Sequence, residues 1–340
     1  MKSSVLFLLG LFLAFQSCKS DINTDRLGTA GTPATTPASG NAKQKPVTKL
    51  DTTNPDQLYM EASKYFQSKQ YGLAEHYLDM AMRHKPNEPD FIMAKADLYM
   101  EQNKSRQALD ILEQGVKAVP RDTFLRLKQM QFLIITRQYS TAIQKSSELL
   151  AMDPQNPEAF FLRGLIFKET GNDSLAVINF QRAVDINPEL SDAYINLGDL
   201  YAKKGDPLAL KYYQNALAFN KDNPIAKHSI AYYYQNHNKL EEAIKLYEDI
   251  ERVTPGYPDA YLNLGIIYYT QEKIPEAYEQ FSKLLELDDQ VAEGYFYRAL
   301  AAEQLGMPQK ALFDMKEAVS IDPQYEEAKK ELDRMVHLKE

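Results

Sequence analysis

The sequence has almost no cysteine: Cys18 is the single one among 340 residues. No disulfide can form within the chain, so no disulfide framework stabilises the fold, and multi-cysteine metal sites are excluded. The five histidines show neither i, i+4 pairing nor an HExxH pattern, and Gly-rich phosphate-binding and GxSxG nucleophile patterns are missing. The sequence therefore predicts no metal site, no cofactor and no catalytic residue, so we do not expect an enzyme.

Positive charge is also scarce in most of the chain. The net charge is −8, but residues 1–54 hold six Lys/Arg and three Asp/Glu, so residues 55–340 hold 33 basic and 44 acidic groups. An acidic body without a basic stripe repels a phosphate backbone. Nucleic acids are therefore disfavoured as partners.

The chain begins with a short apolar run. Residues 5–15 are apolar and follow Met1-Lys2-Ser3-Ser4, while Ser17 and Cys18 come directly after the run. A membrane-spanning helix needs about 20 apolar residues, so a run of this length cannot span a bilayer. A positive start, an apolar stretch and a small residue are typical of a secretory signal peptide.

Residues 1–18 resemble a bacterial lipoprotein signal, in which a small residue precedes the lipidated cysteine. The resemblance implies removal of residues 1–17 and attachment of diacylglycerol and a further acyl chain to Cys18, although Phe15 and Gln16 depart from the family's preferences. Two or more acyl chains anchor a protein stably. Lys19 points to the outer membrane, with the periplasmic or surface face left open. The alternative is an ordinary signal peptide cut near Ser17, with Cys18 incidental.

Residues 18–54 are expected to form a flexible tether that follows the lipidated cysteine. The segment is rich in Thr, Pro, Ala, Gly and Ser, and no apolar residue recurs with a helical or strand period. A random coil of this length spans on the order of 30–35 Å. The tether would hold the rest of the chain away from the membrane.

From residue 55 to residue 325 the sequence repeats eight times. The units start at residues 55, 89, 123, 157, 191, 224, 258 and 292, and all but the fifth have the same length. An alanine marks position 20 of the units, one place early in the fifth: Ala74, Ala108, Ala142, Ala176, Ala209, Ala243, Ala277 and Ala311. Position 8 is small in seven units: Ala62, Ala96, Gly164, Gly198, Ala231, Gly265 and Ala299.

This spacing predicts two helices in each unit. Positions 4, 8 and 11 share one face of a first helix, and positions 20, 24 and 27 share one face of a second. Small residues at positions 8 and 20 allow the two helices to approach closely. Proline at the end of six units stops the second helix.

The stretches "YINLGDLYAKKGD" and "YLNLGIIYYTQEK" identify the chain as similar to tetratricopeptide repeat proteins. The resemblance implies an all-α fold, a right-handed superhelical α-solenoid of about eight helix-turn-helix units, with residues 326–340 as a capping helix. No unit buries its core alone, so neighbours must stack. The third unit is the poorest match, with Arg126, Met130 and Ser146 at positions 4, 8 and 24. We interpret it as either a hinge or a drifted repeat.

The resemblance also implies that the first helices line a concave groove for partners. The candidate groove residues are Tyr59, Phe161, Asn196, His228, Tyr232, Asn263, Tyr269, Phe296 and Tyr297. Asn196 and Asn263 match the asparagine that bonds a ligand backbone in peptide-binding members, but asparagine is also the consensus residue there. The alternative for the aromatic residues is that neighbouring first helices cover their rings. Arg298 is expected to pair with Asp314 of its own unit rather than bind an anion.

We therefore expect a non-catalytic, membrane-anchored scaffold that binds protein or peptide partners, with a role in cell-envelope assembly or secretion. An acidic, aromatic-dotted groove favours this function. The alternative is a glycan-binding surface lipoprotein, because tyrosine-lined grooves also stack on sugars.

Overall fold

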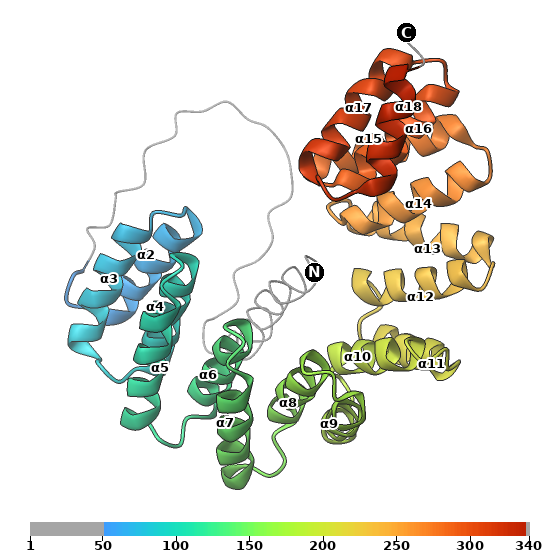
Figure 1. Ribbon diagram of the computed structural model, residues 1–340. Helices are drawn as coiled ribbons and strands as arrows, with labels where there is room; N and C mark the ends of the chain where they lie inside the picture. Colours follow the sequence, from blue (N-terminus) through green and yellow to red (C-terminus); the bar gives the residue numbers. More distant parts are fainter. Residues whose placement is uncertain (1–50, 338–340) are drawn as a thin grey trace, which may run out of the picture. The chain divides into compact units, whose positions relative to one another are not determined.

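The computed structural model describes residues 51–337, and within that range the chain forms 17 α-helices (Figure 1). The first helices of the eight pairs are α2 (Pro55–Gln67), α4 (Pro89–Glu101), α6 (Thr123–Ile135), α8 (Pro157–Glu169), α10 (Ser191–Ala202), α12 (Pro224–Asn236), α14 (Pro258–Thr270) and α16 (Ala292–Gln304). The second helices are α3 (Tyr71–His84), α5 (Ser105–Ala118), α7 (Tyr139–Met152), α9 (Asp173–Ile186), α11 (Leu208–Phe219), α13 (Leu240–Val253), α15 (Ile274–Leu287) and α17 (Pro308–Ile321). The last helix is α18 (Glu326–His337).

This arrangement confirms the predicted all-helical repeat fold of about eight helix pairs with a final helix. Each first helix begins at the first residue of a predicted unit. The predicted signal peptide, the lipidated Cys18 and the tether as far as residue 50 lie outside the described residues, as do residues 338–340 of the predicted capping helix.

The chain divides into two compact units, and the division falls within α7. Residues 51–149 belong to the first unit and residues 150–337 to the second. In the second unit each helix contacts the next one along the chain, and the first helices α10, α12, α14 and α16 contact one another in order. A continuous first-helix surface therefore runs through the second unit.

Polar caps and prolines fix where several first helices begin. Asn54 accepts hydrogen bonds from the backbone N–H groups of Asp56 and Gln57, and Asn156 caps α8 in the same manner. Proline is tolerated at the first helical position without loss of a hydrogen bond, because an N–H there would have no partner within the helix. The dipeptide Asn-Pro begins α2, α8 and α12, at residues 54–55, 156–157 and 223–224, whereas at 187–188 it follows the end of α9.

The turn between the two helices has one backbone conformation in all eight repeats. Position 15 has a φ between 57° and 77°, at Lys69, Asn103, Arg137, Gly171, Gly205, Asn238, Glu272 and Gly306. The next N–H bonds the carbonyl five residues earlier, as from Gln70 to Tyr65 at 2.8 Å. This is the Schellman helix ending, which requires a left-handed residue. The fold imposes that conformation even on Lys69, Arg137 and Glu272.

Side-chain volumes at positions 8 and 24 are matched inside each repeat. Three repeats pair a glycine at position 8 with a ring at position 24: Gly164 with Phe180, Gly198 with Tyr213 and Gly265 with Phe281. A Cβ atom added at Gly164 or Gly265 would lie 2.6 Å from a ring carbon, which is far inside van der Waals contact. Where position 8 is alanine, position 24 is Leu78, Leu112, Tyr247 or Met315, each buried. Glycine thus admits the ring in repeats four, five and seven, whereas repeat six accommodates the Tyr247 ring opposite Ala231.

In repeat three the large side chain is at position 8 and the small one at position 24. The large side chain of Met130 occupies position 8 and the small Ser146 occupies position 24, and both are fully buried. The Ser146 hydroxyl donates to the Ile143 carbonyl at 2.7 Å, so no buried donor is left unpaired. The total volume at the helix contact is conserved although the two residues have exchanged roles. This favours the interpretation of repeat three as a drifted repeat.

The final helix α18 packs on α17 and covers the end of the last repeat. Ala328 and Met335 are buried in the cluster formed with Phe296 and Met315 of repeat eight. Arg334 donates to both carboxylate oxygens of Glu303, at 3.0 and 2.5 Å, which ties α18 to α16. An amphipathic helix of this kind closes a stack whose last repeat has no following neighbour.

Candidate partner-binding surface

Three of the nine candidate groove residues are buried in the protein. Phe161 is 2% exposed and packs against Phe180 with ring centroids 5.7 Å apart, Asn196 is 0% exposed, and Phe296 is 9% exposed. The expectation that these side chains line an open groove is therefore not met, because their own helices and neighbours cover them. The sequence placed them at surface positions of an ideal first helix. Packing between neighbouring repeats encloses them.

Asn196 belongs to a closed polar network in repeat five. Its Nδ2 donates to the Asp192 carbonyl at 2.8 Å, and its Oδ1 accepts from Lys168 Nζ at 2.8 Å. The same ammonium group contacts Asp199 Oδ2 at 2.9 Å, and Asp199 Oδ1 accepts from the Tyr213 hydroxyl at 3.0 Å. Both the donor and the acceptor of the Asn196 amide are therefore bonded within the protein, and neither is available to a ligand.

Asn263 occupies the corresponding position in repeat seven and lies partly exposed. Its Nδ2 donates to the Asp259 carbonyl at 2.8 Å and contacts His228 Nε2 at 3.2 Å. The carbonyl bond fixes the orientation of the amide, because a carbonyl oxygen can only accept. His228 Nε2 must then also accept, which places the imidazole proton on Nδ1. Among the described residues no donor bonds Asn263 Oδ1.

Aromatic rings gather around His228. The ring of Tyr232 lies parallel to the imidazole with centroids 6.2 Å apart, and the rings of Tyr247 and Tyr257 each lie 5.7 Å from it. Tyr247 is fully buried, whereas Tyr232 is 49% exposed on the next turn of α12. We call the set His228, Tyr232, Tyr257, Asp259 and Asn263 the His228 surface.

The electrostatics of this surface favour a neutral imidazole. Burial lowers the pKa of His228 below its usual value, and the charges of Asp259 and Asp199 oppose this only in part. Burial also raises the pKa of Tyr257, with a smaller contribution in the same direction from Asp259. At neutral pH the surface therefore carries the negative charge of Asp259 and no positive charge from His228.

Tyr269 and Tyr297 form a second aromatic group on α14 and α16. Their centroids are 6.3 Å apart, the Tyr269 hydroxyl accepts from Gln304 Nε2 at 2.8 Å, and Tyr297 stacks on Phe281 at 5.6 Å. Both rings are partly exposed. Burial raises the pKa of Glu293, and its charge acts on Tyr297. The structure therefore brings together five of the candidate residues along α12, α14 and α16: His228, Tyr232, Asn263, Tyr269 and Tyr297.

Tyr59 lies in the first unit and forms a separate local environment. Its ring packs against Phe91 with centroids 5.0 Å apart, and burial raises its pKa. The ring contributes to the contact between repeats one and two.

Sequence reasoning missed Tyr257, which precedes α14 and completes the aromatic group around His228. It lies in the linker between repeats, and only helix positions were considered for the groove. An aromatic residue directly before the proline that starts a first helix was the available signal. Such a residue lies at the end of the helix that forms the surface.

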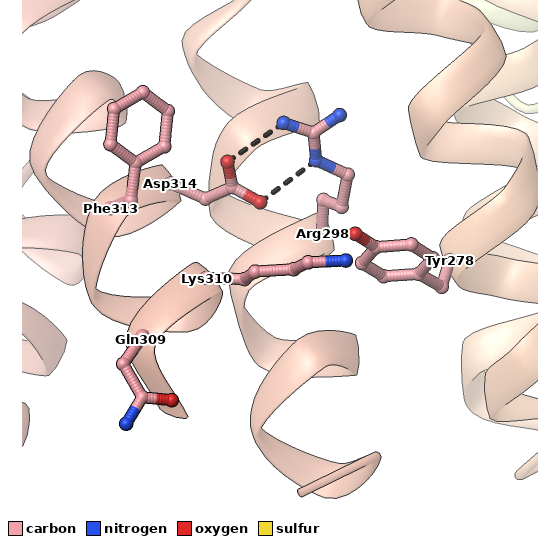
Figure 2. Close-up of a pocket in the computed structure, with 6 residues that line it drawn as sticks. All are labelled: Tyr278, Arg298, Gln309, Lys310, Phe313 and Asp314. Atoms are coloured by element: carbon pink, nitrogen blue, oxygen red, sulfur yellow. Dashed lines mark hydrogen bonds and ion pairs between the residues drawn. The ribbon is translucent and has the colours of Figure 1, made fainter. Parts of the chain in front are cut away.

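A depression of about 370 Å³ lies on the other side of repeat eight, between α15, α16 and α17. Figure 2 shows its lining, in which Arg298 donates two hydrogen bonds to Asp314 at 2.8 and 2.7 Å. This confirms the expected ion pair and leaves the guanidinium group occupied. The Lys310 ammonium lies 5.9 Å from the Tyr278 ring, and Phe313 is 58% exposed at the rim. The depression therefore does not present a free arginine to an anion.

Residues 51–337 contain no group of three or more His, Cys, Asp or Glu residues placed to hold a metal ion. None of the helices in that range combines the length and apolar character needed to cross a bilayer.

The fold and its surface define a helical-repeat protein. Models of the tetratricopeptide repeat match residues 65–129, residues 136–191 and 228–292, and residues 292–325, which together are more than half of the chain. The chain belongs to the tetratricopeptide repeat family.

Relatives and solved structures agree with this assignment. The chain is 24% identical over 201 residues to Hsp70-Hsp90 organizing protein 1 of Glycine max, which covers 56% of the chain and 34% of that protein. It resembles a chain of the APC/C hetero-tetramer Cut9-Hcn1, with a TM-score of 0.60, 18% identity, and coverage of 85% of this chain and 57% of the other. A tetratricopeptide repeat protein from Parabacteroides merdae gives a TM-score of 0.53, 17% identity, and coverage of 73% and 98%. The structural likenesses show the fold, and the chain spans about a third of the curated relative.

Proposed function

We propose that the protein is a non-catalytic scaffold that binds a segment of a partner protein along α12, α14 and α16. The observation that carries this proposal is that His228 lies against both the half-exposed ring of Tyr232 and the amide of Asn263, whose oxygen is available. An exposed aromatic ring supplies contact area with little loss of side-chain entropy, and the amide oxygen can accept a backbone N–H from an extended chain.

The relatives support a partner-binding role. One relative is an organizing protein for Hsp70 and Hsp90, and one similar structure belongs to a hetero-tetramer, so tetratricopeptide repeats similar to these act in protein assemblies. Stacked repeats present an extended surface, which suits a partner segment better than a small molecule. Which partner this chain binds is a separate question from the fold it shares.

We further propose that the scaffold is anchored to the outer membrane through acylated Cys18 and acts in the cell envelope. The support is the sequence alone: a positive start, an apolar run and a small residue directly before the single cysteine. Mass spectrometry of the mature N-terminus tests this. We expect a diacylglycerol-modified, acylated Cys18, and loss of the protein from the membrane fraction in the Cys18→Ser variant. An unmodified Cys18, or a start elsewhere, would overturn the anchor.

Site-specific photocrosslinking tests the binding role. A photoreactive residue at Ile266, one turn after Asn263 on α14, should capture a defined envelope protein in intact cells. The Tyr232→Ala and Tyr269→Ala double variant should lose that capture, whereas Phe313→Ala, which removes a similarly exposed ring outside this surface, should retain it. Equal capture by all three proteins would overturn the role of this surface.

The glycan alternative has a direct readout in the same preparation. Purified protein mixed with envelope oligosaccharides should show an unchanged melting temperature if the surface binds protein segments. A rise in melting temperature that Tyr232→Ala abolishes would instead favour glycan recognition and displace the proposal.

A further inference from the structure

We infer that the segment bound at the His228 surface is basic, with a lysine or arginine side chain of the partner lying against Tyr232 and facing Asp259. The inference rests on the proposed binding function and adds the chemistry of the partner. Three features of the second unit carry it: unpaired carboxylates along the first helices, a ring face without a cation, and a neutral histidine between them.

The carboxylates stand at the second position of three first helices. Asp192, Asp259 and Glu293 make no ion pair with any described residue, although nearby Asp249 and Asp314 are each held by a Lys or Arg. Burial alone raises the pKa of Asp192 and of Glu293, and no neighbouring cation offsets it. Asp192 is partly buried and Asp259 and Glu293 are exposed, and none of the three has the paired cation that the protein gives to Asp249 and Asp314.

The charge of Asp259 acts electrostatically on three groups at and next to the His228 surface. It acts on the His228 imidazole and on the hydroxyls of Tyr247 and Tyr257. Since Asn263 donates to His228 Nε2, the imidazole is held in its neutral form and cannot balance this charge. The local potential is negative, and a cation approaching from solvent lowers its energy there.

The chain itself shows how its tyrosines receive cations. In four repeats a lysine next to the turn residue lies over the aromatic ring at position 11, with 5.6–5.9 Å between Nζ and the ring centroid: Lys104 over Tyr99, Lys204 over Tyr201, Lys239 over Tyr234 and Lys273 over Tyr268. Tyr232 has a comparable ring, half exposed, and no described lysine or arginine lies over it. Its outer face is therefore open to a cation from a partner.

Acidic and apolar segments fit this surface less well. An acidic segment would bring like charges next to Asp259, and an apolar one would remove water from that carboxylate without replacing the lost hydration. A lysine or arginine side chain satisfies both needs, because its stem packs on the ring and its charge remains near the carboxylate. Charge complementarity thus selects a basic segment among the possible occupants.

Selection from a random library of short peptides tests the inference with the folded protein. The library is displayed on phage and selected on the full chain, with Tyr232→Ala as the counter-selection. Peptides retained by the wild-type protein and lost on Tyr232→Ala should be enriched in lysine and arginine. A selected peptide should bind the Asp259→Asn variant roughly five- to tenfold more weakly, whereas Glu286→Gln, the same change on α15, should leave its affinity unaltered.

The outcomes separate this inference from the function on which it rests. Neutral or acidic peptides that depend on Tyr232 would overturn the basic partner and leave the binding function standing. Unchanged affinity in Asp259→Asn for a basic peptide would also overturn it, because the charge would then act elsewhere. Failure to retain any Tyr232-dependent peptide would count against the binding function itself. Circular dichroism of each variant confirms that the fold is intact.

Discussion

Repeats five and seven carry the same Asn-Leu-Gly sequence in their first helices, yet the asparagine has opposite roles in the two. In repeat five, Lys168 of the preceding repeat holds Asn196 Oδ1, and the side chain is fully buried. In repeat seven the amide instead meets His228, and its oxygen remains available. The surrounding side chains decide whether the amide oxygen at this shared position is bound within the protein or remains available.

The residue at position 9 explains why Lys168 is held beside Asn196 in repeat five, whereas no lysine holds Asn263 in repeat seven. Repeat five has Asp199 there, which accepts from both Lys168 and the Tyr213 hydroxyl. Repeat seven has Ile266 at position 9 and Phe281 at position 24, so neither the carboxylate nor the hydroxyl is present. Two polar groups close the first surface, and their apolar counterparts leave the second one open.

The largest expected effect is on the free energy of unfolding. It concerns the glycine at position 8, which faces a ring in both repeats. Gly198→Ala and Gly265→Ala should each lower the free energy of unfolding by about 3 kcal/mol, because the added Cβ meets a buried ring that cannot move aside. Urea denaturation followed by circular dichroism measures this. Gly256→Ala, with open space around its Cβ position, should change stability little.

A second substitution distinguishes this packing from helix propensity. Tyr213→Leu added to Gly198→Ala should restore much of the lost stability. Four other repeats have alanine at position 8, and two of those have leucine at position 24. No recovery in the double variant would contradict the volume match between positions 8 and 24. The expected coupling is of the size seen for residues in direct contact, about 0.5–3 kcal/mol.

The next effect belongs to repeat five alone. Lys168→Met removes the donor to Asn196 Oδ1, and the buried oxygen left without a partner should lower the free energy of unfolding by about 1–2 kcal/mol. Lys203→Met is the control, because its ion pair with Asp173 at 2.7 Å is solvent-exposed and should contribute under about 1 kcal/mol. Equal losses in the two variants would show that the closed network has no special weight.

Sequence alone predicts much of the fold and little of this difference. The small residues at position 8 and the closing prolines predict the helix pairs, because both act within one repeat. The left-handed turn residue is hidden where it is Lys69, Arg137 or Glu272, since the fold rather than the residue imposes that conformation. Asn196 and Asn263 share the same Asn-Leu-Gly motif, and the side chains that distinguish them lie outside it, in the preceding repeat and at positions 9 and 24 of the same repeat.

A binding comparison sharpens the contrast between the two asparagines. With a basic peptide selected on the His228 surface, Asn263→Ala should weaken binding about fivefold through loss of one hydrogen bond, whereas Asn196→Ala should leave the affinity unchanged and reduce stability. Isothermal titration calorimetry and urea denaturation measure the two quantities on the same samples. Weaker binding by Asn196→Ala would contradict the assignment of that residue to the closed network.

The smallest expected effect is the pH dependence that His228 adds to the stability of the protein. Because burial lowers the pKa of His228 below its ordinary 6.5, the unfolded chain binds a proton more readily than the folded one, so stability falls as pH drops below about 6.5. Protonation would also break the Asn263 contact and place a positive charge beside Tyr232, which weakens capture of a basic peptide. The groups facing the imidazole, Asp259, Asp199, Tyr247 and Tyr257, oppose this only through the two carboxylates.

The His228→Gln variant isolates this contribution, since glutamine keeps an acceptor for Asn263 and does not titrate. Between pH 7.5 and pH 5, the difference between wild type and variant in the free energy of unfolding, measured by urea denaturation, should change by at most about 1.4 kcal/mol per pH unit, the limit for one proton. Raised carboxyl values at Asp192 and Glu293 act in the opposite direction but are present in both proteins and cancel. Parallel pH profiles would mean that folding leaves the pKa of His228 unchanged, and burial would then not be the dominant influence on the imidazole.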